Sequence, residues 1–148
     1  MSPSELQQYL HEHIPISHAM GVSVLSASAD SVRVEAPLEA NINHRATVFG
    51  GSASAVAILA AWSLLHLRVR DAGLDAQLVI QRNAMDYERP IHGAFTAEAR
   101  LADPERWERF RKTLERRGRA RIRVESVLTF ADEPAGHLTG EFVALTQG

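Results

Sequence analysis

The most informative stretch of this chain for its architecture is NINHRATVFGGSASAVAILAAWSLL, Asn41 to Leu65. Two adjacent glycines, Gly50 and Gly51, precede a run of residues that is apolar on every side. A surface helix instead shows one apolar stripe and one polar face. The pattern therefore predicts a helix over residues 52–69 that the rest of the chain surrounds. Because glycine has no Cβ, the pair lets another group approach the start of this helix closely.

Alternating apolar and polar segments lie on both sides of this helix, and such alternation is typical of strands with one buried face. They cover residues 21–28, 31–39, 76–90, 93–101, 119–131 and 137–146. Strands that short turns connect pair antiparallel. We therefore expect an α+β fold in which one curved antiparallel sheet wraps around the long apolar helix.

Two further helices are predicted by the residues at their ends. The first covers residues 4–13, with Ser4 as its N-cap. The second covers residues 103–118, with Asp103 as its N-cap and Gly118 at its end.

Length and composition limit the classes of function. The 148 residues are expected to form a single domain, residues 1–148, with an N-terminal helical segment over 1–15. The net charge of −2 predicts no general attraction to nucleic acid or to a membrane. The sequence has no cysteine, which excludes thiolate catalysis and thiolate metal sites. The N-terminal residues do not resemble a signal peptide, so we expect a cytoplasmic protein.

The seven histidines are scattered, and no HExxH, EF-hand or P-loop pattern is present. We predict no metal ion and no cofactor.

The layout and several motifs resemble the hotdog-fold thioesterases and dehydratases, and most closely the thioesterase-like family named after the YiiD C-terminal domain. The resemblance rests on TVFGGS at 47–52, AAWSLL at 60–65, MDYERPI at 85–91 and the final GRARI and GEFVAL segments. It implies a homodimer, or a dimer of dimers, in which two sheets join edge to edge. It also implies that a thioester of coenzyme A or of acyl carrier protein binds at the interface, against the start of the central helix.

The resemblance assigns roles to individual residues. Many relatives carry His-Gly-Gly where this chain has Phe49, Gly50 and Gly51. They place a carboxylate two helical turns further on, at the position of Ile58, and this chain has no acid anywhere in its central helix before Arg70. An asparagine six residues before the histidine of that motif corresponds to Asn43, which implies that Asn43 holds the attacking water.

The chemistry of thioester hydrolysis gives Gly50 and Gly51 a catalytic role. Attack on a thioester carbonyl places negative charge on its oxygen, and free N–H groups at a helix N-terminus stabilise that charge. The alternative is that the pair only permits a tight turn. Ser52 follows in GGSAS, one residue short of a nucleophile elbow. We interpret Ser52 as a capping residue rather than a nucleophile.

His44 and Asp86 are candidate bases. Histidine can accept a proton near neutral pH, although His44 is also an ordinary loop residue. In an extended strand Asp86 shares a face with Ile80, and if that face lines the site Asp86 can deprotonate water. The alternative is an exposed carboxylate beside an arginine. Tyr87, on the opposite face, is expected in the core.

Nine of the 16 basic residues lie between Arg106 and Arg123. Such a run is usually a solvated helix face. The other interpretation is a docking surface for the phosphates of coenzyme A or for an acidic carrier protein.

The sequence thus predicts an acyl-thioesterase. Asn43, Gly50, Gly51 and Asp86 are its catalytic candidates, and small helix residues line an acyl channel. The substrate-binding candidates are His44, Phe49, Ser52, Ser54 and Ile58. Two alternatives stay open: a module that binds acyl thioesters without catalysis, which the missing helix acid favours, and a dehydratase of the same fold.

Overall fold

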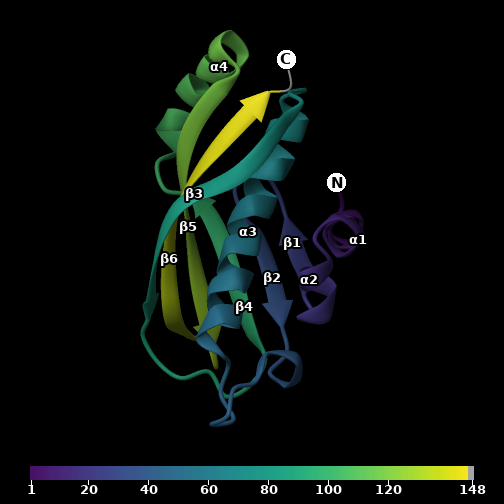
Figure 1. The fold of residues 1–148 in the computed structure, drawn as a ribbon, viewed down its shortest axis with the longest axis vertical. Helices are drawn as coiled ribbons and strands as arrows, with labels where there is room; N and C mark the ends of the chain where they lie inside the picture. The colour runs from purple at the N-terminus through teal and green to yellow at the C-terminus, as the bar shows by residue number, and fades with distance from the viewer. Residues whose placement is uncertain (147–148) are drawn as a thin grey trace.

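A computed structural model describes residues 1–146, which form an α+β fold with a curved sheet packed around one long helix (Figure 1). The elements are α1 (Pro3–His13), α2 (Pro15–Ala19), β1 (Ser23–Ala27), β2 (Val32–Ala36), η1 (Glu39–Asn41), α3 (Gly50–Asp71), β3 (Ala76–Tyr87), β4 (Phe95–Leu101), η2 (Pro104–Arg106), α4 (Trp107–Arg117), β5 (Arg119–Phe130) and β6 (Glu133–Thr146). The predicted fold class is confirmed.

The sheet has six strands in the order β1-β2-β4-β5-β6-β3, and every neighbouring pair is antiparallel. Buried and exposed residues alternate along its strands as predicted. On β5, for example, Ile122 and Val124 are buried while Arg121 and Arg123 are exposed. One face of the sheet therefore forms the core with α3, and the other face is open.

Helix α3 is the core of the fold. Its 22 residues contact strands β2 to β6, and its buried positions lie on most sides of the helix, as the all-round apolar pattern predicts. Ser126 of β5 donates a buried hydrogen bond of 2.8 Å to the carbonyl oxygen of Ala57, which fixes the helix against the sheet. Length and hydropathy alone would allow α3 to cross a membrane, but most of it is buried within the protein, as in a core helix.

The ends of several elements differ from the predictions. Ser2, not Ser4, caps α1, because Ser2 and Glu5 form a reciprocal capping box. Asp103 makes no side-chain capping bond and begins a short 3-10 turn before α4. Gly118 ends α4 with a positive φ of 72°, as predicted. Helix α3 extends two residues beyond the predicted range at each end.

Strand β6 begins at Glu133, earlier than the predicted 137, because a two-residue turn joins it to β5. Ala131 and Asp132 form this turn with φ values of 53° and 63°. Hairpin turns of this kind usually contain asparagine and glycine. Ala131 and Asp132 form neither an Asn-Gly nor an Asp-Gly pair, so this turn had no local signal in the sequence.

Candidate functional site

The first turn of α3 presents backbone N–H groups without a side-chain cap. Phe49 is the N-cap residue and offers no capping acceptor. The amides of Gly50, Gly51 and Ser52 precede the first helical hydrogen bond, which runs from the N–H of Ala53 to the oxygen of Phe49 at 3.0 Å. Orphan N–H groups at a helix start attract an anion or a carbonyl oxygen that gains negative charge. We call residues 49–52 the glycine turn.

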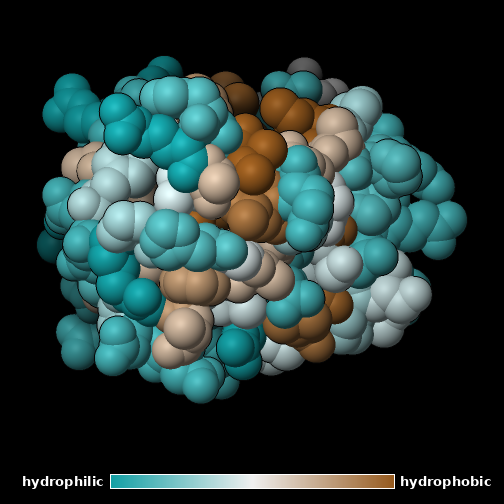
Figure 2. Space-filling model, turned by 90° about the horizontal axis from the view of Figure 1, so that it is seen from below, coloured by the Kyte–Doolittle hydropathy of each residue, from teal (hydrophilic) through white to brown (hydrophobic). Residues whose placement is uncertain are grey.

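A cavity of about 360 Å³ lies beside the glycine turn. Apolar side chains form much of its wall, among them Val48, Ala53, Leu128 and Ala135. This glycine cavity combines an apolar wall with a few polar groups, as ligand sites commonly do. Figure 2 looks at this end of the molecule from below and shows apolar atoms interrupting the hydrophilic surface. Phe49, in the glycine turn itself, is an exposed large hydrophobic residue with a relative accessibility of 58%.

Tyr87 is a site residue that the sequence analysis misplaced. It is 60% exposed and lines the glycine cavity, so its predicted place in the core is wrong. Its hydroxyl donates a 3.2 Å hydrogen bond to the carbonyl oxygen of Gly50. A Cβ added to Gly50 would lie 3.4 Å from the tyrosine ring. The ring therefore packs directly on the glycine turn.

Asp86 lies on the face of β3 that is opposite to the predicted one. Ile80 pairs with Phe142 of β6, but Arg82 pairs with Glu141, so Gln81 is an extra residue in the strand. A β-bulge of this kind reverses the alternation of the residues that follow it. Ile80 consequently faces the core, whereas exposed Asp86 points to the outer face, so the predicted shared face is wrong. Its role as a base stays a prediction.

Asn43 organises the loop that leads to the glycine turn. Its side-chain oxygen accepts hydrogen bonds from the N–H groups of Arg45 and Thr47, at 2.8 and 3.1 Å. Its amide nitrogen donates to the Thr47 hydroxyl at 2.8 Å. The side-chain oxygen of Asn43 thus already accepts two hydrogen bonds. One of the two amide hydrogens of its side chain can still donate a hydrogen bond to a water molecule. His44, at the tip of the same loop, is exposed.

Buried Asn41, which the sequence analysis did not single out, fixes this loop to the fold. Its side-chain amide donates to the carbonyl oxygens of Met20 and Pro37, at 2.9 and 2.8 Å. The backbone carbonyl oxygen of Asn41 accepts a hydrogen bond of 2.7 Å from the N–H of Phe49. The chain therefore reaches the glycine turn in a fixed position.

Glu88 is the carboxylate among the residues that line the glycine cavity. It is hydrogen-bonded to Nδ1 of His137 at 2.6 Å, and this pair was also missed because the residues lie 49 positions apart. Arg89, its neighbour, has a structural role: its guanidinium donates to the carbonyl oxygens of Phe130, Glu133 and Pro134 and so fastens the β5–β6 turn.

Three further predicted residues lie along α3. Ser52 occupies the third position of the helix, so it is not the cap that we expected. Ser54 and Ile58 are half-buried, on a stripe that continues to Trp62. This stripe faces away from the most buried side of the helix.

The basic segment lies at the other end of α3. Arg68, near the end of α3, lies 4.4 Å above the ring of Trp107 at the start of α4. Within α4, Arg111 pairs with Glu108 and Glu115 at 2.9 and 2.7 Å. Part of the segment is therefore a solvated helix face. In residues 1–146 no group of three or more His, Asp or Glu side chains is arranged to hold a metal ion.

Comparison with known proteins identifies the family. The family described as "Putative thioesterase (yiiD_Cterm)" matches residues 3–146. The chain belongs to this thioesterase family. A protein of unknown function from Chlorobaculum tepidum TLS is 29% identical, over 99% of this chain and 98% of its own, with a TM-score of 0.91. A "putative thioesterase" from Shewanella oneidensis is 26% identical, over 97% of this chain and 96% of its own, with a TM-score of 0.85.

A more distant structure shares the fold. A thioesterase from Haemophilus influenzae is 12% identical, over 99% of this chain and 92% of its own, with a TM-score of 0.80. The predicted hotdog fold and family are thus confirmed, and membership of the YiiD_C family supports thioesterase activity in general. This member of the family nevertheless has Ile58 where the resemblance implied a helix carboxylate.

Proposed function

We propose that this chain hydrolyses acyl-coenzyme A thioesters at the interface of a homodimer, in the cytoplasm. The observation that carries the proposal is the uncapped glycine turn, which opens beside an apolar cavity. Family membership supports the general activity. Coenzyme A as the carrier, the dimer and the catalytic residues are the specific parts of the proposal.

In the proposed reaction, the free N–H groups of the glycine turn determine where the thioester carbonyl binds. The thioester carbonyl oxygen binds at the amides of Gly50 and Gly51, and the apolar cavity receives part of the acyl group. Water attacks the carbonyl carbon, so a C–O bond forms and the oxygen becomes an oxyanion that the amides stabilise. The C–S bond then breaks, and coenzyme A leaves as a thiolate that takes up a proton. The products are a carboxylic acid and free coenzyme A.

The attacking water needs an acceptor for its proton. Glu88 lines the cavity and replaces the missing helix acid in our proposal, with His137 orienting its carboxylate. Asp86 is the competing base and pairs with His137 across β3 and β6, but it is not among the described residues that line the glycine cavity. Asn43 contributes its remaining amide hydrogen to the position of the water.

The two edges of the sheet support the proposed dimer. At the β1 edge, Gln7 of α1 accepts the N–H of Val24 at 2.9 Å, and His11 lies 2.7 Å from the oxygen of Val22. At the other edge, β3 ends the sheet in the described part of the chain, over 12 residues. An uncovered strand of this length presents unpaired backbone groups to a second copy. We propose that β3 pairs antiparallel with β3 of a partner subunit.

A module that binds acyl thioesters without hydrolysis is the second candidate function. The observation that favours it is Ile58 at the position where the resemblance implied a carboxylate. Such a module would use the same glycine turn and cavity, because both contribute to binding as well as to catalysis.

Turnover decides between the two functions. Purified protein is incubated with acetyl-, hexanoyl-, decanoyl- and benzoyl-coenzyme A, and the released thiol is measured with a thiol reagent. We expect saturable release from at least one of them and slower release from the matched acyl carrier protein thioester. Binding without release from any thioester, measured by calorimetry, contradicts the hydrolase and supports the binding module. Faster release from the carrier protein contradicts the choice of coenzyme A.

A further inference from the structure

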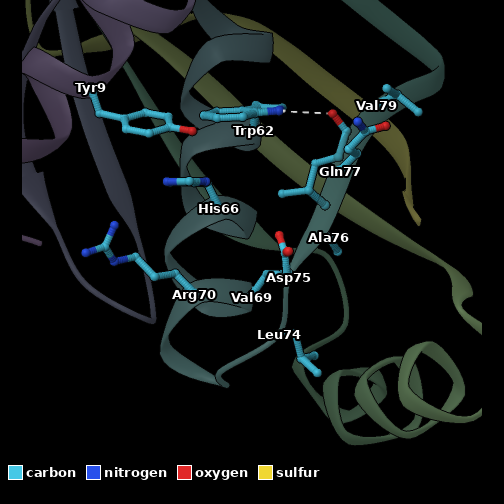
Figure 3. A pocket seen from close by; sticks show the side chains of 11 residues that line it. Tyr9, Trp62, His66, Val69, Arg70, Leu74, Asp75, Ala76, Gln77 and Val79 are labelled. Atoms are coloured by element: carbon cyan, nitrogen blue, oxygen red, sulfur yellow. Dashed lines mark hydrogen bonds between the residues drawn. The ribbon is translucent and has the colours of Figure 1, made fainter. Parts of the chain in front are cut away.

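A second, larger cavity lies between the C-terminal half of α3 and the start of β3 (Figure 3). Its volume is about 560 Å³. Tyr9 of α1 and Trp62 and His66 of α3 form one side, and apolar residues of β3 including Leu78 form another. We call it the ring cavity. Its size is within the range of small-molecule sites.

Three rings of the ring cavity are stacked. Trp62 and His66 lie 4.9 Å apart between centroids with an angle of 10° between their planes, and Tyr9 lies 4.5 Å from His66 at 26°. The indole N–H of Trp62 donates to the oxygen of Leu78 at 3.2 Å. That bond fixes the orientation of the indole, so its ring is preorganised to stack on a flat ligand.

His66 contributes as a neutral ring. Burial lowers its pKa below the usual range, and the charges of Arg70 and His13 act in the same direction. Its Nε2 atom is buried and has no hydrogen-bond partner within residues 1–146. The stack therefore offers flat, uncharged surface rather than a positive charge.

One end of the ring cavity is charged. Arg70 and Asp75 lie there, beyond His66 and away from Trp62, as Figure 3 shows. Trp62 and Arg70 are eight residues apart, which corresponds to about 12 Å along a helix. Burying these charged groups against an apolar chain would cost free energy, so apolar contact is limited to the part of the cavity that the rings and Leu78 line. The cavity consequently suits a short apolar group better than a long one.

The proposed dimer brings this cavity to a glycine turn. Within one protomer Gly51 and Trp62 are separated by about 16 Å of helix. In an antiparallel pairing over the whole of β3, Ala76 lies opposite Tyr87 of the partner subunit, and Tyr87 packs on the glycine turn of its own protomer. The charged end of the ring cavity of one protomer, beside Ala76, thus adjoins the glycine turn of the other, and the rings lie further in.

From these observations we infer that the ring cavity is the acyl-selecting pocket of the partner's site, and that it selects short aromatic acyl groups through stacking on Trp62. The inference rests on the proposed function and names its substrate class. It makes Trp62 a specificity-determining residue, with Tyr9 and His66 holding its ring in place.

Substitution of Trp62 tests the selection. We expect wild type to hydrolyse benzoyl-coenzyme A with a higher kcat/KM than decanoyl-coenzyme A. Trp62→Leu should lower the ratio of the two values about five- to tenfold, because an aromatic contact is lost. Trp62→Phe, the matched control, should keep most of the ratio. An unchanged ratio in Trp62→Leu, with the dimer and the circular dichroism spectrum intact, overturns the inference.

Mixed dimers test the arrangement in trans. Heterodimers of one Gly51→Val protomer and one Trp62→Leu protomer, isolated with two affinity tags, contain an intact site only if the two residues of a site come from different protomers. We expect about half of the wild-type activity toward benzoyl-coenzyme A. Activity between about one tenth and one twentieth, as expected when both residues belong to one protomer and Trp62→Leu lowers activity five- to tenfold, overturns the arrangement.

A binding measurement separates this inference from the hydrolase proposal. The chain has two tryptophans, so in Trp107→Phe the fluorescence reports Trp62 alone. Benzoyl-coenzyme A should quench this fluorescence more at equal concentration than decanoyl-coenzyme A does. Quenching without turnover contradicts the hydrolase but supports the aromatic pocket. Equal quenching by both thioesters, or none, overturns the pocket.

Discussion

Gly51 controls how closely a ligand can approach the backbone amides of the glycine turn. Its φ is not among the positive values, so the backbone accepts other residues. A Cβ added there would overlap the ring of Phe49, which is exposed and can rotate away. Gly51→Val should therefore keep the fold while its branched side chain blocks the amides. We expect kcat/KM to fall by at least ~10²-fold.

Steady-state kinetics with the most active thioester measure this effect, and the melting temperature checks the fold. Gly50→Ala is the milder companion, because its Cβ would lie at an ordinary contact distance of 3.4 Å from Tyr87. Undiminished hydrolysis by a folded Gly51→Val protein would rule out the oxyanion role of the glycine turn.

Two carboxylates, those of Glu88 and Asp86, compete for the role of general base. Glu88→Gln should lower kcat by ~10²–10⁴-fold and remove the acidic limb of the pH–rate profile, because the base is lost. Asp86→Asn, the matched control, should stay within a few-fold of wild type, because Asp86 is not among the described residues that line the glycine cavity. The reverse result would restore Asp86 as the base.

The half-buried ring of His66 makes the free energy of unfolding depend on pH. Burial lowers its pKa in the folded protein, so below pH ~6.5 the unfolded chain binds a proton that the folded protein resists. The stability contributed by neutral His66 is therefore complete above that pH and is lost as the pH falls toward the folded pKa. Urea unfolding at pH 7.5 and pH 5.5 should show a smaller loss in His66→Phe than in wild type. An equal loss in both proteins would contradict this assignment.

Secondary-structure elements show which features the sequence could predict. The all-round apolar pattern of residues 52–69 placed α3 in the core, and period-two alternation placed the strands, because burial follows hydrophobic periodicity. The bulge at Gln81 had no such signal, since glutamine suits a regular strand as well. One extra residue moved Asp86 to the outer face and Tyr87 to the site. The faces predicted for Asp86 and Tyr87 were thus wrong because the bulge shifts the register of β3 against β6.

The β5–β6 turn has an unfavourable backbone conformation for its residues. Ala131 and Asp132 adopt left-handed φ values, which cost non-glycine residues free energy. Replacing the pair by Asn-Gly should raise the free energy of unfolding by ~1–2 kcal/mol. Chemical denaturation measures the gain. The single substitution Ala131→Asn should give a smaller part of it, and a loss of stability in the double variant would contradict the turn geometry.

The whole molecule has one covered and one uncovered sheet edge. Side chains of α1 occupy backbone groups next to β1, whereas the outer side of β3 is unpaired in residues 1–146. This asymmetry links the N-terminal helix to the dimer, because covering one edge leaves β3 as the strand available to a second copy. It also links the dimer to specificity, since pairing along β3 brings the ring cavity of one protomer to the glycine turn of the other.

Hydrogen exchange tests this arrangement at the level of the assembly. Light scattering at micromolar concentration should give the mass of a dimer. Amides of residues 76–87 should exchange more slowly at high protein concentration than after dilution below the dissociation constant, because pairing protects one row of β3 amides from water. Amides of residues 23–27 serve as the internal control, since α1 covers that edge in the monomer and dilution should leave their exchange unchanged. A dimer in which β1 rather than β3 gains protection would place the interface at the other edge and separate the two cavities.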